Sequence, residues 1–269
     1  MPVETVALAH DADMEADAFS FRLTARAFAP HYHRAWVIGC VLDGARRFWV
    51  RGREYRAGAG DVVILRPGEV HACAPENAAP FVWRGFHFRG GSAAAAFLER
   101  LTRDDSSLEP LCPGDGVLDE LLAVHALMGA AAEADSKRSR LFAALRRLAR
   151  DGRNAVADRR APTPPEPALE ALRSHLERHA PDRVSLEDMA AMARMGKFRL
   201  VRAFARMTGA TPYRYLESAR VNRAQELLEQ GFPPSEAALA AGFADQSHLT
   251  RAFRTRLGVT PGACRRRPQ

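Results

Sequence analysis

The chain has few cysteines and no long apolar run, and both shortages exclude classes of protein. Its four cysteines, Cys40, Cys73, Cys112 and Cys264, include no Cys-x-x-Cys pair. That spacing argues against a thiolate zinc site and against a dense disulfide framework. No stretch of eighteen apolar residues occurs, so we expect no membrane span. The first seventeen residues are acidic and lack the pattern of a secretory signal, so we expect a cytoplasmic protein.

Motifs for catalysis are also missing. No Ser/His/Asp set, no pair of acids and no Gly-rich phosphate loop stands in a context that would support a reaction. The turn at residues 58–61 precedes a strand pattern and not a helix, so it is no nucleotide motif. We expect no enzyme activity, no catalytic residue and no cofactor.

Positive charge is concentrated at one end of the chain. Residues 168–269 contain 17 Lys and Arg against 10 Asp and Glu, whereas the first 167 residues contain 22 of each. A neutral segment followed by a basic one suggests that only the basic segment, residues 168–269, meets a polyanion such as double-stranded DNA. Residues 151–167 contain four prolines and almost no large apolar residue. We therefore expect an extended linker there, between domains at 1–150 and 168–269.

The neutral part shows two kinds of hydrophobic pattern. Aromatic and β-branched residues gather at 36–42, 46–51, 61–65 and 81–88, with turn signals between them. Short strands at that spacing predict a small antiparallel barrel or jelly roll. From 92 to 150 the apolar residues recur at helical spacing. These helices could pack on the barrel or on a second subunit.

The basic part contains an internal repeat. Residues 198–212 align with 247–261 at a constant offset of 49, and Leu, Arg-Ala-Phe, Gly and Thr-Pro coincide. Each copy reads as a short helix, a turn and a longer helix, which is the helix-turn-helix pattern. The intervening segment, 213–230, predicts a helix of roughly 27 Å. Such a rod could place two reading helices in successive major grooves, about 34 Å apart.

Within the repeat, small residues mark the helix ends. We expect Gly209 and Gly258 to end the long helices in the left-handed conformation, and Thr211 and Thr260 to cap the helices that follow. Asp245 can cap the second long helix, and Gly196 holds that place in the first copy. Ser185 and Asp188 resemble a capping box. The long helices expose residue types that reach bases and phosphates, namely Lys197, Arg199, Val201 and Arg202 in one copy and Gln246, Ser247, Thr250 and Arg251 in the other.

Residues 240–261 resemble the signature of the AraC/XylS family of bacterial transcription regulators, and the similarity covers the last hundred residues. It implies that Phe198, Val201 and Arg202 face bases in one groove, with the exposed residues of the second copy in the next. Residues 52–71 resemble the cupin-like sensor domain of that family. The resemblance thus implies an α+β chain, with a cupin-like β-barrel and appended helices followed by an all-α double helix-turn-helix domain.

The resemblance also implies a small-molecule effector in the barrel and dimerisation through the helices that follow it. Family members with a known pocket point to His31, Trp36, Cys73, Trp83 and Gly85 as its lining. Trp83 would offer a stacking wall and Gly85 would leave space. His33 and His71 could meet His31 inside the barrel and complete the effector-binding set. Of the neighbouring arginines at 46 and 47, either one could recognise an acidic effector or form a surface salt bridge.

Two other functions compete with this interpretation. His31, His33 and His71 suit the metal of a cupin dioxygenase, but no carboxylate follows the His pair closely, so we expect no metal. A non-specific architectural DNA binder would show no preferred site. We expect instead a sequence-specific regulator whose partners are DNA, an effector, a second copy of the chain and, for an activator, RNA polymerase.

Overall fold

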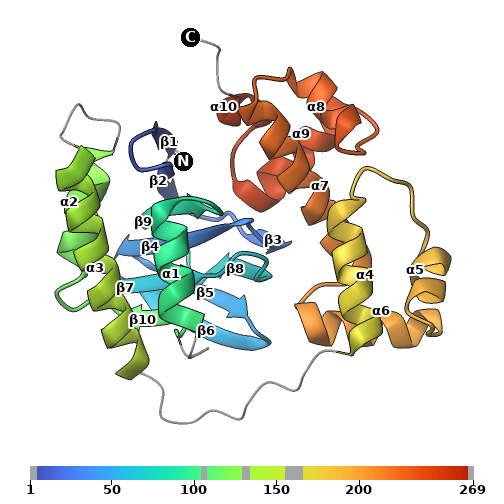
Figure 1. Ribbon diagram of the computed structural model, residues 1–269, viewed down its shortest axis with the longest axis horizontal. Coiled ribbons are helices and arrows are strands. Elements are labelled where there is room, and N and C mark those ends of the chain that lie inside the picture. Colours follow the sequence, from blue (N-terminus) through green and yellow to red (C-terminus); the bar gives the residue numbers. More distant parts are fainter. Residues whose placement is uncertain (1–4, 104–107, 129–133, 155–165, 266–269) are drawn as a thin grey trace.

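The computed structural model describes residues 5–103, 108–128, 134–154 and 166–265. Figure 1 shows a β-rich half, which holds all ten described strands, beside an all-helical half. The α+β class predicted from the sequence is therefore confirmed. Among the described residues no helix is long and apolar enough to cross a membrane.

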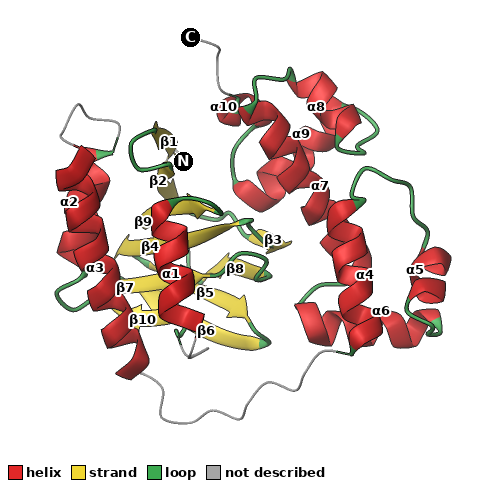
Figure 2. Cartoon of the chain, viewed as in Figure 1, coloured by secondary structure: helices red, strands yellow, loops and turns green. Residues whose placement is uncertain are grey.

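Two antiparallel sheets form the N-terminal half (Figure 2). The strands are β1 (Thr5–Asp11), β2 (Ala16–Leu23), β3 (Phe28–His31), β4 (Ala35–Asp43), β5 (Ala45–Val50), β6 (Arg53–Gly58), β7 (Asp61–Leu65), β8 (His71–Pro75), β9 (Phe81–Arg89) and β10 (Leu111–Pro113). Their order is β1-β2-β9-β4-β7-β10 in one sheet and β3-β8-β5-β6 in the other. The four stretches named from the sequence correspond to β4, β5, β7 and β9, whereas β1, β2, β3, β6, β8 and β10 were not singled out. Most of β1 is exposed and β10 is three residues long, so neither shows a clear alternation of buried residues.

The larger sheet separates two hydrophobic cores, and β9 contributes to both. Trp83 packs between the sheets with Phe19 and Phe48, whereas Phe86 and Phe88 pack under the helices. This alternation follows from the two-residue period of a strand. The covering helices are α1 (Ala93–Arg103), α2 (Leu118–Leu127) and α3 (Ala134–Asn154). Phe86 and Phe88 thus face the helices, whereas Trp83 faces the space between the sheets.

Seven helices form the C-terminal half. They are α4 (Pro167–Arg178), α5 (Leu186–Met192), α6 (Lys197–Thr208), α7 (Pro212–Glu229), α8 (Pro234–Ala240), α9 (Gln246–Leu257) and α10 (Pro261–Cys264). The pairs α5–α6 and α8–α9 are the two helix-turn-helix units, and α7, with 18 residues, joins them. Residues 155–165 of the expected linker lie outside the described residues, and α3 and α4 occupy its two ends.

The helix ends follow the predicted chemistry with one exception. Ser185 and Asp188 form a capping box, and the Asp245 carboxylate accepts a hydrogen bond of 2.7 Å from the His248 N–H. Gly209 and Gly258 end α6 and α9 with φ of +84° and +74°. Thr211 and Thr260 stand at N-cap positions but make no side-chain capping bond, so that expectation was wrong. Proline at the next position removes one of the unpaired N–H groups of the first turn and fixes φ near its helical value.

The two halves pack directly against each other through Tyr32. The Tyr32 N–H donates to Ser218 Oγ at 3.1 Å, and Asn222 Nδ2 donates to the Tyr32 carbonyl at 3.1 Å. The Tyr32 ring stacks on Tyr215, with 4.8 Å between centroids. Arg89 adds ion pairs to Asp17 of its own domain and to Glu229 on α7. The sequence predicted two separate domains and gave no sign of this contact.

Candidate functional site

The exposed faces of α6 and α9 form the candidate DNA interface. On each helix an apolar stripe is fully buried, with Leu200 and Phe204 on α6 and Leu249 and Phe253 on α9 at 0% exposure. The opposite side is therefore turned outward. Phe198 is 86% exposed, the largest value among the exposed large hydrophobic residues. A phenyl ring left in water on a helix rich in arginine is suited to apolar contact with a thymine methyl group.

The second unit presents the better-organised surface. Gln246, Ser247 and Arg251 are exposed, and Thr250 is partly exposed. The Thr250 hydroxyl donates to the Gln246 carbonyl at 2.8 Å, which leaves its methyl group for contact with a partner. Arg251 forms no ion pair within the described part of the chain. Its guanidinium is therefore available for a base edge or a phosphate.

Acidic neighbours partly neutralise the first unit. Lys197 pairs with Glu187 of α5, and Arg199 lies 3.8 Å from Glu166. Lys197 and Arg199 would both have to break these ion pairs to bind phosphate. Among the described residues Arg202, one helical turn along, has no such pair. Gly196 at the N-cap of α6 offers no side-chain capping bond, unlike Asp245 at the start of α9.

A cavity of about 220 Å3 lies between the sheets and opens toward α9. Its wall combines barrel residues with residues of the DNA-binding half, including Arg256 and Leu257. Five of the six predicted effector-binding residues line it, namely His31, His33, His71, Cys73 and Trp83. Trp36 does not, because it packs in the core under the helices. Trp36 is therefore not a candidate effector contact, contrary to our expectation.

Arg46 is the charged group most deeply buried in this cavity. It is 1% exposed and lies between Phe28 and Phe81, 5.8 and 5.1 Å from their ring centroids. Its Nη1 and Nη2 donate to Cys73 Sγ at 3.4 Å and to the Arg26 carbonyl at 2.6 Å. No carboxylate in the described residues pairs with it. The neighbouring Arg47 instead lies on the surface, 3.7 Å from Glu54, so the two arginines that the sequence left equivalent differ in structure.

Three buried N–H groups in the cavity wall have no hydrogen-bond partner. They are Arg46 Nε, Trp83 Nε1 and Arg256 Nε. A buried donor without an acceptor costs about 1–3 kcal/mol. All three groups are donors, so only a group with acceptor atoms could satisfy them, and the positive charge of the two arginines would favour an anion.

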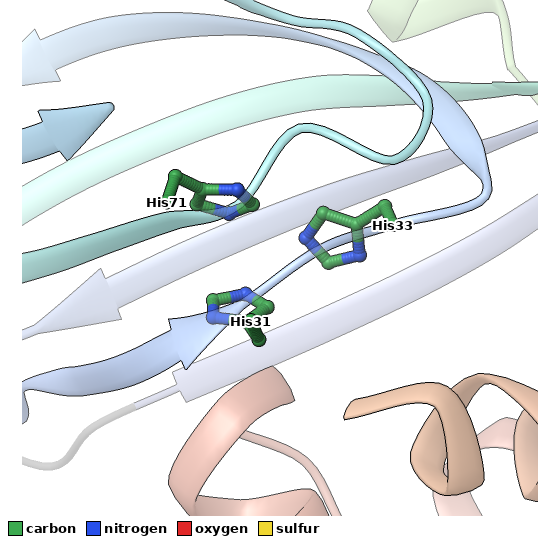
Figure 3. A group of neighbouring side chains, drawn as sticks. All are labelled: His31, His33 and His71. Carbon is green, nitrogen blue, oxygen red and sulfur yellow. The ribbon is translucent and has the colours of Figure 1, made fainter. Parts of the chain in front are cut away.

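Four histidines gather at one side of the cavity. His31, His33 and His71 each offer a ring nitrogen within 4.8 Å of the others, and Figure 3 shows the three rings around a common space. The His87 ring lies 4.9 Å from that of His33. Burial lowers the pKa of His31 and His33 well below the ordinary value, and it lowers the pKa of His87 to about 4. Burial also lowers the pKa of His71, so it favours the neutral form of all four rings.

Gly85 does not provide space for a ligand, contrary to our expectation. A Cβ atom there would lie 2.5 Å from the Ile38 carbonyl oxygen and 2.6 Å from the Phe19 ring. Its partner across the strands, Gly39, lies beneath the Trp83 indole, and a Cβ at Gly39 would be 1.9 Å from Cζ2. The space left by the missing side chains of Gly39 and Gly85 is thus occupied by the rings of Trp83 and Phe19.

This packing predicts the effect of Gly39→Ala. The added methyl group forces the Trp83 indole to move, and we expect the free energy of unfolding to fall by about 1–3 kcal/mol. Gly90→Ala is the matched control, because a Cβ there meets nothing within 4 Å. We expect a change of less than about 0.5 kcal/mol for the control. Urea unfolding followed by tryptophan fluorescence measures both, and equal midpoints would refute this account of Trp83.

Arg256 was not predicted as a site residue, although its place in the repeat carries a signal. Its position in the repeat corresponds to Met207, and it falls on the buried stripe of α9 seven residues after Leu249. The structure buries Arg256 to 5% exposure and pairs it with Glu217 on α7. An arginine where the other copy has methionine indicates a role specific to the second unit. Tyr32 carried no comparable signal.

Comparison with known proteins agrees with both halves of this description. Residues 16–149 match the AraC-like ligand binding domain, and residues 189–267 match a helix-turn-helix domain family. The chain is 28% identical to the HTH-type transcriptional regulator YbfI of Bacillus subtilis, over 93% of this chain and 91% of that one. It is 27% identical to the MmsAB operon regulatory protein of Pseudomonas aeruginosa, over 80% and 68%. ToxT from Vibrio cholerae has a similar fold, with a TM-score of 0.56, 12% identity and coverage of 92% and 96%.

Proposed function

The chain belongs to the AraC family of bacterial transcription regulators, and on that premise we propose that α6 and α9 read two adjacent major grooves of one operator. The supporting observation is that each helix buries its apolar stripe and turns its polar residues outward. At 1.5 Å per residue, the 18 residues of α7 span about 27 Å. This length suits two helices that enter grooves one helical turn apart.

The effector in this proposal is a small organic anion held in the cavity between the sheets. The three unsatisfied donors support it, because a carboxylate accepts several hydrogen bonds and neutralises Arg46. The rings of Phe19, Phe48, Phe81 and Trp83 supply an apolar wall for the rest of the molecule. His31, His33, His71 and Cys73 complete the proposed contacts.

Regulation would follow from the position of the cavity. Its wall includes Arg256 on α9, and Arg256 is held by Glu217 of α7. An anion in the cavity competes with Glu217 for this guanidinium and so changes how α9 is held against α7. We further propose that the chain acts in the cytoplasm as a homodimer through α2 and α3, which would present two such domains to paired half-sites. An activator of this kind would also contact RNA polymerase.

The proposed reading of DNA is tested by selecting binding sites for the full-length chain from random duplexes. We expect one consensus that spans two adjacent major grooves per subunit, bound more tightly than random duplex by a factor of about 10^3 or more. Gel shifts at several salt concentrations then compare the selected site with a scrambled one. Equal affinity for both duplexes, with a steep salt dependence alone, would identify a non-specific architectural binder instead.

A further inference from the structure

We propose that His31, His33 and His71 bind a divalent late first-row transition ion such as Zn2+ in the wall of the effector cavity. The role of the cavity in this inference rests on the proposed sensor function, whereas the ion site itself is inferred from the geometry of the histidines. The three rings come from β3, the β3–β4 connection and the start of β8, and they surround one space (Figure 3).

The separations fit a tetrahedral ion after a small movement. Zn–N bonds of about 2.0–2.1 Å place two ligand nitrogens about 3.4 Å apart. The three nitrogens already lie within 4.8 Å of one another, so the longest separation needs to shorten by at most about 1.4 Å. His33 is only partly buried, which gives one ring freedom to make this movement. The sequence led us to expect no metal because an acid is missing, yet three imidazoles and one open position are a sufficient set for zinc.

Hydrogen bonds to the backbone prepare two of the rings for an ion. His31 Nδ1 lies 2.7 Å from the Ala29 carbonyl, and His71 Nδ1 lies 3.0 Å from the Glu69 carbonyl. A carbonyl oxygen can only accept a hydrogen bond, so both Nδ1 atoms must carry the hydrogen. Both Nε2 lone pairs therefore remain free for a metal. Metal-binding histidines usually have such second contacts, which fix the tautomer and the ring orientation.

The surrounding charges determine what occupies the open position. Arg46 and Arg256 line the same cavity, and the two carboxylates in its wall, Asp17 and Glu229, pair with Arg89. No carboxylate joins the three histidines among the described residues. Two guanidinium groups repel a bare dication and favour one that also holds an anion. The carboxylate of the proposed effector would meet this need, with its acceptor atoms shared between the ion and the unsatisfied N–H groups.

The site is placed to affect the contact between the two halves of the chain. Tyr32 stands between the ligands His31 and His33, and its backbone N–H and C=O bind Ser218 and Asn222 of α7. An ion that fixes the residues on both sides of Tyr32 also fixes this contact. Metal occupancy and the docking of the DNA-binding half are therefore linked.

Zinc titration of the metal-free full-length chain against a chromophoric chelator tests the site. A second pair of histidines, His175 and His179, stacks one turn apart on the surface, 4.5 Å between centroids, and could capture metal by itself. The measurement therefore uses a His175→Ala/His179→Ala background. We expect one zinc per chain there, and His33→Ala in the same background should weaken its affinity by at least about a hundredfold. Substitution by Co2+ should give the intense visible absorption of four-coordinate cobalt, lost in the His33→Ala chain.

Stability and DNA binding are measured on the same samples. Zinc should raise the melting temperature of the background chain by about 5 °C or more at a hundredfold excess over its dissociation constant, and leave the His33→Ala chain unchanged. His33→Gln replaces His33→Ala if circular dichroism shows that the alanine variant is unfolded. No zinc in the background chain, or equal affinity after loss of His33, would overturn the metal site. Binding to the selected duplex would then still support the regulator function, so the two proposals fail separately.

Discussion

Replacing Arg46 by methionine is expected to weaken the binding of an organic anion by at least about thirtyfold, which corresponds to about 2 kcal/mol or more. Arg46 is the buried cation of the cavity, and its Nε has no partner in the free protein. An anion that pairs with it does so away from water, where charge-assisted hydrogen bonds are strongest. Methionine fills a similar volume between Phe28 and Phe81 but offers neither charge nor donor.

The fold should tolerate this replacement, which separates a binding role from a structural one. A guanidinium without a carboxylate partner is costly to bury, so a hydrophobic residue there should leave the free energy of unfolding unchanged or raise it. Calorimetry with a panel of aliphatic and aromatic monocarboxylates, each paired with its uncharged alcohol, measures the loss. Arg47→Met is the matched control, because Arg47 lies on the surface beside Glu54. Equal affinities of the Arg46→Met and Arg47→Met chains, or preference for the alcohols, would contradict the proposed effector class.

Arg251→Ala is expected to weaken binding to the selected operator by about 1–3 kcal/mol and to relax the preference at one base pair. Arg251 is exposed on α9 and lacks an ion pair within the described chain, so its loss should not disturb the fold. Arg53→Ala removes the same charge from the exposed edge of the barrel and should leave the affinity unchanged. Gel shifts with the consensus and its single-base variants provide the comparison. An operator affinity equal to that of the Arg53→Ala chain would exclude Arg251 from the interface.

A contrasting pattern is expected on α6 for Lys197→Ala. Its partner Glu187 keeps the Lys197 ammonium near the α5–α6 junction, where it can reach a phosphate more readily than a base. Loss of one phosphate contact should weaken binding to all duplexes alike and reduce the salt slope by about 1. The difference between the two substitutions would therefore assign a base contact to Arg251 of α9 and a phosphate contact to Lys197 of α6.

The repeat made the helical half predictable. Two copies at a constant offset place Leu200 with Leu249 and Phe204 with Phe253, and all four are fully buried. The caps at Ser185 and Asp245 and the left-handed glycines at the ends of α6 and α9 followed from side-chain chemistry that acts within one helical turn. These features are local, so the sequence alone contains them.

The contacts between the halves could not be predicted, because they join residues far apart in the chain. Tyr32 reads as one aromatic residue of a strand region, and only the structure places its ring on Tyr215. The same limit applies to the cavity. Trp36 and Trp83 look equivalent in sequence, but strand alternation in a two-sheet barrel sends one under the helices and the other between the sheets. Whether Arg46 or Arg47 was buried depended on the register of β5, which the pattern left open.

Hydroxyl-radical footprinting of the selected operator tests the central claim, that α6 and α9 of one chain read adjacent major grooves. With the full-length chain we predict two protected backbone segments per subunit, separated by about one helical turn. Arg202→Ala should weaken protection in one segment, and Arg251→Ala in the other. A single protected segment, or loss of the same segment in both variants, would contradict the claim that both helices read DNA.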